Sequence, residues 1–238
     1  MPDWITHIGI SFSGKYIKGW DLRLIAIGAV LPDIFKPLYI IFLDTFNIYS
    51  QEILTYFEPF HTPFFSLLFA IAISLLTQRF WFSLIQIIIP VAIHYILDNF
   101  QVQIGYYVLL LYPFSFKNLN IPILNWDSII GIVIPLLILP FVLISIIKYK
   151  PQKVFVPNLF RNKRTIISFI IIIFLFIFPF FTRNKFYEHN YHSLQFYKDP
   201  TLYKGQIVYF PVSKVININP FMVEEMGRKF IIKTFYKY

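Results

Sequence analysis

The stretch IIGIVIPLLILPFVLISII, residues 129–147, contains no charged side chain, and IISFIIIIFLFIFPFF, residues 166–181, shows the same composition further along the chain. A helix needs about 20 apolar residues to cross a bilayer, or slightly fewer when its flanking side chains snorkel. The many β-branched and aromatic residues do not predict strands here, because an isolated segment in lipid satisfies its backbone only as a helix. Both stretches therefore predict transmembrane helices.

The composition of the whole chain supports the same class. Of the 238 residues, 57% are hydrophobic and 14% are charged, whereas a soluble domain carries about 25% charged residues. The absence of cysteine excludes disulfides, thiolate zinc sites and cysteine nucleophiles. The net charge of +9 fits basic cytoplasmic loops better than nucleic-acid binding, since the basic residues do not interleave with aromatic ones. The expected partner is the lipid bilayer, and no nucleic acid is expected.

The remaining apolar stretches predict further helices. Residues 63–76 and 81–97 form an expected helical hairpin, and residues 22–43 form an expected helix broken by Pro32-Asp33 and Lys36-Pro37. Residues 4–18 predict a short helix that dips into one leaflet, and residues 103–112 are too short to span. The predicted fold class is an all-α polytopic membrane protein with about five membrane helices, one of them broken, plus a small β-rich C-terminal appendage.

The C-terminal tail changes character and sets the predicted domain boundary. Turn signals such as Asp199-Pro200 alternate there with strand-like runs at residues 206–212 and 228–235. We therefore expect a helical membrane domain over residues 1–181 and a small β-rich tail over residues 182–238.

Charge asymmetry predicts the orientation. The loop over residues 148–164 holds six basic residues and no acidic one, whereas residues 44–58 hold three acidic residues and no basic one. The positive-inside rule then places the first loop in the cytoplasm. Alternating the spans places residues 44–61, 98–126 and the tail from residue 182 on the extracytoplasmic side of the inner membrane.

Ionisable residues inside apolar segments are costly, so each one needs a physical reason. His94 and Asp98 lie four residues apart at the outer end of an apolar helix. Their side chains therefore point to one side, about 6 Å apart. That spacing suits a shared metal ion, and it equally suits a structural hydrogen bond between the two residues.

Two further residues belong near this pair. His61 begins the preceding helix, and the outer ends of an antiparallel hairpin lie side by side, so His61 comes close to His94 by topology. The alternative role of His61 is that of an interfacial helix cap. Asp33 needs a cation, which is either a metal or Lys36 one turn away. Histidine and carboxylate ligands suit zinc, with manganese or iron as less specific alternatives. His189 and His192 in the tail form a surface pair, and the chain has no G-x-S-x-G or H-E-x-x-H motif.

The order of motifs resembles the YdjM-like family of predicted membrane-bound metal-dependent hydrolases. The matching stretches cover about residues 1–147 and are THIGIS (6–11), GAVLPD (28–33), HTPFFS (61–66), HYILD (94–98) and YPFS (112–115), with Asp127 opening the next span. The family is distantly similar to the zinc-dependent phospholipase C superfamily. The resemblance implies a divalent metal held by His7, Asp33, His61, His94 and Asp98.

One departure from the family pattern bears on the metal count. The family motif is longer and has two histidines, whereas Phe65 stands about where the second one would be. This predicts either a single-metal site or a degenerate one.

The functional hypothesis is a membrane-embedded metal-dependent hydrolase of a phosphate ester such as a phospholipid. Lys36 is the expected phosphate-binding residue, a metal-bound hydroxide is the expected nucleophile, and the sequence identifies no catalytic acid. The alternatives are a non-enzymatic membrane protein that keeps the fold, and a transporter that uses His94 and Asp98 as an ion relay.

Overall fold

In the computed structural model, the described residues up to residue 190 are mainly helical. It describes residues 4–17, 19–38, 41, 56–100, 109–116, 119, 121, 123, 129–150, 154 and 162–190, and three strands within 214–231. The elements before the strands are α1 (Trp4–Ser11), the 3-10 helix η1 (Phe12–Tyr16), α2 (Leu22–Val30), the 3-10 helices η2 (Leu31–Asp33) and η3 (Glu58–His61), α5 (Pro63–Leu75), α6 (Phe80–Asn99), α7 (Ile129–Ile147) and α8 (Lys163–Asn190).

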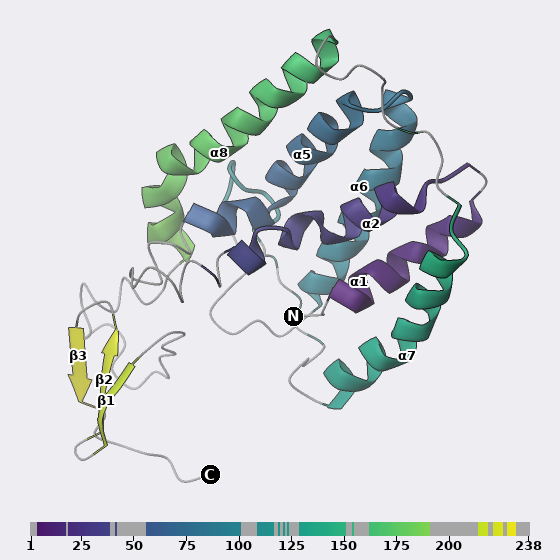
Figure 1. Cartoon of the computed structure of the whole chain (residues 1–238). Coiled ribbons are helices and arrows are strands. Elements are labelled where there is room, and N and C mark those ends of the chain that lie inside the picture. Colours follow the sequence, from purple (N-terminus) through teal and green to yellow (C-terminus); the bar gives the residue numbers. More distant parts are fainter. Residues whose placement is uncertain are drawn as a thin grey trace.

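The long helices lie side by side, with α6 and α2 near the middle (Figure 1). Helix α6 packs against both α2 and α5, α8 covers the other side of α5, and α7 packs on α1. The larger buried apolar cluster draws its residues from α2, α5, α6 and α8, and a smaller one lies between α1, η1, α2 and α7. The predicted hairpin of residues 63–76 and 81–97 is present as α5 and α6.

The prediction of about five membrane helices is wrong. Within the described residues, two helices are long and apolar enough to cross a membrane, Phe80–Asn99 and Lys163–Arg183, and two shorter apolar helices are Pro63–Leu75 and Val133–Ile147. The predicted broken span over residues 22–43 begins as a helix of nine residues, α2. This helix ends early because Pro32 follows it and has no N–H to continue the hydrogen-bond ladder.

The predicted β-rich appendage is also not shown. Helix α8 continues to Asn190, past the expected boundary at residue 182. Beyond it the structure describes three short antiparallel strands, β1 (Lys214–Ile218), β2 (Phe221–Glu225) and β3 (Arg228–Ile231), in the order β1-β2-β3. The expected strand at residues 206–212 lies outside the described residues, and three strands of four or five residues do not establish a domain.

The apolar surface of α8 supports insertion of this helix into a membrane. Among the described side chains of α8, ten large apolar ones are exposed, including Phe180 at 63% and Phe181 at 79%. An exposed apolar face of this extent is costly in water and favourable in hydrocarbon. Two apolar helices of spanning length thus support a membrane protein.

Helix α2 is held at its start by a polar network around Asp21. The carboxylate of Asp21 accepts hydrogen bonds from the backbone N–H of Arg23 at 2.9 Å and from its guanidinium at 2.9 and 3.0 Å. The backbone N–H of Asp21 donates to Oε1 of Gln86 at 2.5 Å, which ties the start of α2 to α6. Burial alone would raise the pKa of Asp21, but the hydrogen bonds from Arg23 hold it below its usual value.

We expect Arg23→Met to destabilise the protein at neutral pH by about 1–3 kcal/mol, because it leaves a buried carboxylate without its charged donor. The folded pKa of Asp21 is lowered, so the stabilisation is complete above the unfolded pKa of about 3.9 and is lost as pH falls through the folded value. In Arg23→Met this acid-induced loss should begin at higher pH. Thermal unfolding between pH 3 and 7 measures both effects. The control is Arg79→Met at an exposed position, and an identical pH profile for the two variants would contradict the prediction.

Candidate metal centre

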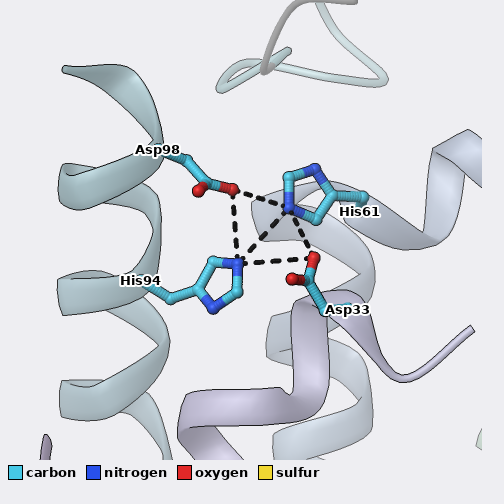
Figure 2. A group of neighbouring side chains, drawn as sticks. All are labelled: Asp33, His61, His94 and Asp98. Atoms are coloured by element: carbon cyan, nitrogen blue, oxygen red, sulfur yellow. Dashed lines mark hydrogen bonds and ion pairs between the residues drawn. The ribbon is translucent and has the colours of Figure 1, made fainter. Parts of the chain in front are cut away.

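Four ionisable side chains from three separate segments meet at one end of the bundle (Figure 2). Asp33 ends η2, His61 ends η3, and His94 and Asp98 lie one turn apart near the end of α6. The expected convergence of these residues is therefore present in the structure. The burial is nearly complete: Asp33, His94 and Asp98 are at most 1% exposed, whereas the side chain of His61 is 18% exposed.

The facing atoms of these residues form one tight group. His61 Nε2 lies 2.9 Å from Asp98 Oδ2, 3.2 Å from Asp33 Oδ1 and 3.4 Å from His94 Nε2. His94 Nε2 lies 3.3 Å from Asp98 Oδ2 and 3.6 Å from Asp33 Oδ1. One ligand atom from each residue lies within 4.8 Å of the other three.

Five of the six separations among these donors are close to those of a tetrahedral metal site. With metal–ligand distances of about 2.0–2.1 Å, the ligands of a regular tetrahedron are about 3.3–3.4 Å apart. The five distances above range from 2.9 to 3.6 Å, so a divalent cation fits with small side-chain adjustments. Two imidazole nitrogens and two carboxylate oxygens are donors that zinc accepts, and manganese and iron also bind them.

The tautomer of His94 is set by the backbone of α2. His94 Nδ1 lies 2.8 Å from the carbonyl oxygen of Ala29. A carbonyl oxygen only accepts, so Nδ1 carries the hydrogen in this bond, and in the neutral ring Nε2 then presents its lone pair to the cluster. A backbone carbonyl is a common outer partner of metal-binding histidines and fixes both tautomer and ring orientation.

Gly28 makes that contact possible. A Cβ atom at this position would lie 2.3 Å from the carbonyl oxygen of Ile87 in α6. Only glycine allows the two helix backbones to approach this closely. The next residue, Ala29, then comes within hydrogen-bond reach of His94. The glycine thereby determines the position of one end of the site.

The local structure around His61 orients its ring toward α6. The hydroxyl of Thr62 donates to the carbonyl oxygen of Pro59 at 2.7 Å, which closes the 3-10 turn. Pro63 then opens α5 at the first helical position, where its missing N–H costs nothing. Because His61 is the one partly exposed member of the group, it marks the side from which a small molecule could reach the centre.

His7 lies next to the four-residue group, outside it. Its ring stacks on that of His94 with centroids 3.7 Å apart, and its Nε2 lies 3.5 Å from Asp98 Oδ1, the oxygen that faces away from His61. Burial lowers the pKa of His7, which keeps the ring neutral. The structure thus places His7 where it can orient Asp98 and His94, although the resemblance implied a ligand.

Lys36 contacts the group from the outside. Its ammonium forms an ion pair with Asp33 Oδ1, three residues back in the chain, and its side chain is 30% exposed. Burial alone would raise the pKa of Asp33. The hydrogen bonds from His61 and His94 and the positive charge of Lys36 instead hold the pKa of that carboxyl well below its usual range. Asp33 is therefore an ionised carboxylate in the site.

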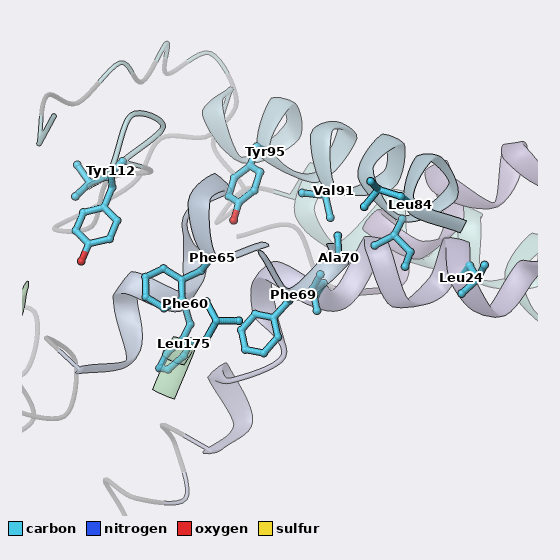
Figure 3. Packing of buried hydrophobic residues seen from close by; sticks show 13 residues of the cluster. Leu24, Phe60, Phe65, Phe69, Ala70, Leu84, Val91, Tyr95, Tyr112 and Leu175 are labelled. Atoms are coloured by element: carbon cyan, nitrogen blue, oxygen red, sulfur yellow. The ribbon is translucent and has the colours of Figure 1, made fainter. Parts of the chain in front are cut away.

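Phe65, which stands where the family has a second histidine, faces the core (Figure 3). It is fully buried and contacts the rings of Phe60, Tyr112 and Phe178. The position at which the resemblance implied a second histidine is thus filled by hydrophobic packing. Of the two readings of that departure, a single-metal site and a degenerate one, four donor atoms within 4.8 Å of one another favour the first.

The remaining positions singled out in the sequence lie elsewhere. Tyr112 is buried, and its hydroxyl donates to Thr182 Oγ1 at 2.5 Å, so it joins the turn before α7 to α8. Asp127 and His192 lie outside the described residues, and the side chain of His189 does as well. Sequence reasoning missed the Ala29 carbonyl and the buried pair of Ser66 Oγ and Tyr95 OH, 2.8 Å apart, which joins α5 to α6 beside His61.

Comparisons with models of protein families, with curated proteins and with solved structures found no match. The resemblance to the YdjM-like family therefore stays a prediction.

Proposed function

We propose that Asp33, His61, His94 and Asp98 bind a single divalent cation, best satisfied by zinc, with manganese or iron as alternatives. The observation that carries the proposal is the hydrogen bond from His94 Nδ1 to Ala29, which directs the lone pair of Nε2 into a group of donor atoms that lie within 4.8 Å of one another. A buried cluster of this kind is costly without a cation to balance its carboxylates.

We propose that the activity is hydrolysis of a phosphate ester. A bound divalent metal polarises a phosphoryl oxygen and lowers the pKa of bound water to about 7. The carboxylates of Asp33 and Asp98 balance the charge of the metal, and the fixed ring of His94 holds the geometry. His61 lies on the accessible side, and Lys36 next to Asp33 supplies a positive charge for the phosphate of the substrate.

The proposed substrate is a phospholipid or another lipid phosphate. The cluster lies at the end of α6, a helix long enough to cross a bilayer, and this supports a site near the depth of lipid headgroups. The motif order shared with the YdjM-like family supports the same activity. The main alternative is a membrane protein without enzymatic activity, in which the ion pairs of Asp33 with Lys36 and His61 only hold the helices together.

Metal analysis of the purified protein in lipid separates these alternatives. We expect about one equivalent of transition metal per chain after reconstitution with zinc, manganese or iron in turn, because the four donors surround one point. Release of product from a panel of phosphate-ester lipids should require that metal. If none of the three metals binds, the hydrolase proposal is wrong and only the membrane fold stands.

We further propose that the loop over residues 148–164 is cytoplasmic and that the tail after residue 182 is extracytoplasmic in the inner membrane. The excess of basic residues in the loop supports this orientation. Reporter fusions at Lys153 and Lys204, both outside the described residues, should report opposite sides. An extracytoplasmic signal at Lys153 would reverse the orientation and move the metal centre to the cytoplasmic leaflet.

A further inference from the structure

The ammonium of Lys36 is paired with the Asp33 oxygen that a bound metal would need. It forms an ion pair with Oδ1 of Asp33, and the same oxygen faces His61 Nε2 at 3.2 Å and His94 Nε2 at 3.6 Å. The oxygen that completes the tetrahedral group is thus also the oxygen that holds the lysine. Asp33 is almost fully buried, whereas Lys36 is 30% exposed at the rim.

Binding a divalent cation and an ammonium to the same oxygen costs free energy. Both would lie within about 4 Å of each other, and two like charges at that distance repel strongly where water is largely excluded. The lysine side chain is long and flexible and can rotate toward the rim, whereas the metal-binding side chains are fixed in place by burial. A metal that binds Asp33 would therefore displace the lysine.

We propose that Lys36 is an internal counter-cation that divalent metal displaces from Asp33, and that the displaced ammonium then binds the phosphate of the substrate. This inference rests on the proposed metal site and adds a coupling to it. In the metal-free protein Lys36 neutralises part of the buried negative charge. In the metal-loaded protein the two carboxylates balance the metal, so the charge of Lys36 attracts an anion to the rim.

The coupling predicts that metal and phosphate anion bind cooperatively. Each ligand favours the same arrangement, in which Lys36 has left Asp33, so binding of one promotes binding of the other. It also predicts opposite effects from loss of the lysine. Without it the metal meets no competitor at Asp33 and binds more tightly, while a phosphate diester loses its positive partner at the rim and binds more weakly.

The experiment compares the wild-type protein with Lys36→Met in lipid nanodiscs by titration calorimetry, with zinc and then with dimethyl phosphate added to the zinc-loaded protein. We expect Lys36→Met to bind zinc about tenfold more tightly and dimethyl phosphate about tenfold more weakly, as the charge repulsion and attraction at this distance imply. Lys36→Arg keeps the charge and should resemble the wild type. Lys15→Met, which removes an ammonium bound to Ser145 between η1 and α7, should change neither affinity.

The outcomes separate this inference from the metal site itself. If the wild type binds no zinc, the proposed function fails. If the wild type binds zinc and Lys36→Met binds it equally or more weakly, the counter-cation role is wrong and Lys36 has a structural role only. If zinc binding tightens but dimethyl phosphate binds the two proteins equally, the transfer of the lysine to the anion is wrong.

A second measurement on the unaltered chain covers the case in which Lys36→Met does not fold. Acylation of lysine amines, followed by mass spectrometry, reports how far Lys36 is shielded. Zinc should increase the labelling rate of Lys36 several-fold, because the ammonium leaves its ion pair, and should leave that of Lys15 unchanged. An unchanged or lower rate at Lys36 with zinc bound would overturn the inference.

Discussion

Replacing His94 with alanine should remove bound metal and hydrolysis of phosphate-ester lipids together. The change deletes the Nε2 donor and the hydrogen bond to Ala29 that orients it. Loss of an outer partner alone typically lowers metal affinity by about 10–100-fold, so loss of the ligand should exceed that. Activity should fall more steeply than metal occupancy, because a metal with fewer fixed ligands lowers the pKa of its bound water less effectively. Metal content and product release, measured side by side in lipid, test this.

Asp98→Asn tests the same link between bound metal and hydrolysis without changing the volume of the side chain. The amide keeps the size of the carboxylate but loses its charge, so metal binding and hydrolysis should again fall together. Asp21→Asn is the matched control: it makes the same substitution at another buried carboxylate, and asparagine also caps helices well. A purely structural role for His94 and Asp98 would give a different result. Interhelical hydrogen bonds in membrane proteins average about 0.6 kcal/mol, so both variants would then lose modest stability and no metal would be involved.

The transporter alternative is distinguished in the same samples. If His94 and Asp98 form an ion relay, both substitutions would lower ion flux into proteoliposomes while metal content stays at zero throughout. The geometry already favours a closed site over a relay. His94, Asp98, Asp33 and His61 face one point and do not form a row along α6, as stepwise ion transfer would require.

The helical elements were predictable from sequence where hydropathy alone decides them. The helices expected at residues 63–76 and 81–97 are present as α5 and α6. Two long apolar runs joined by a short polar link can satisfy their backbone hydrogen bonds in lipid only as helices. The number of spans was overestimated because hydropathy does not show where a helix ends. The apolar run over residues 22–43 contains Pro32, and α2 stops before it. Turn signals predict strands in the tail without determining their bounds or pairing. Strand β3 lies within the expected run at residues 228–235, whereas the expected run at residues 206–212 lies outside the described residues.

The site was predictable in part, for reasons that differ between residues. His94 and Asp98 follow from helical spacing, and His61 follows from the hairpin, whose outer ends must meet. Asp33 was placed by its need for a cation together with the family resemblance. The partner of His94 could not be predicted, because Ala29 contributes a backbone carbonyl and every residue has one. The outer position of His7 depends on how α1 packs, which its weakly amphipathic sequence does not specify.

Gly28→Ala should have the second largest effect, although the residue carries no functional group. In a helix interior this change normally stabilises a protein by about 1 kcal/mol through helix propensity. Here the new Cβ would lie 2.3 Å from the carbonyl oxygen of Ile87. Relieving that contact requires α2 and α6 to separate by about 1 Å, and overpacking of this kind costs about 1–3 kcal/mol or more. The clash should outweigh the propensity gain, so the variant should be less stable overall.

The same separation should weaken the metal centre from a distance. Moving α2 away stretches the 2.8 Å hydrogen bond from His94 to Ala29 and shifts Asp33, which follows α2 directly in the chain. We expect zinc affinity to fall about 10–100-fold, as for loss of an outer partner, in protein that remains folded below its lowered melting temperature. Ser13→Thr adds one methyl group at an exposed position and should change neither quantity. Zinc affinity equal to wild type in Gly28→Ala would show that the close approach of α2 and α6 does not position His94, and that the carbonyl of Ala29 is dispensable to the site.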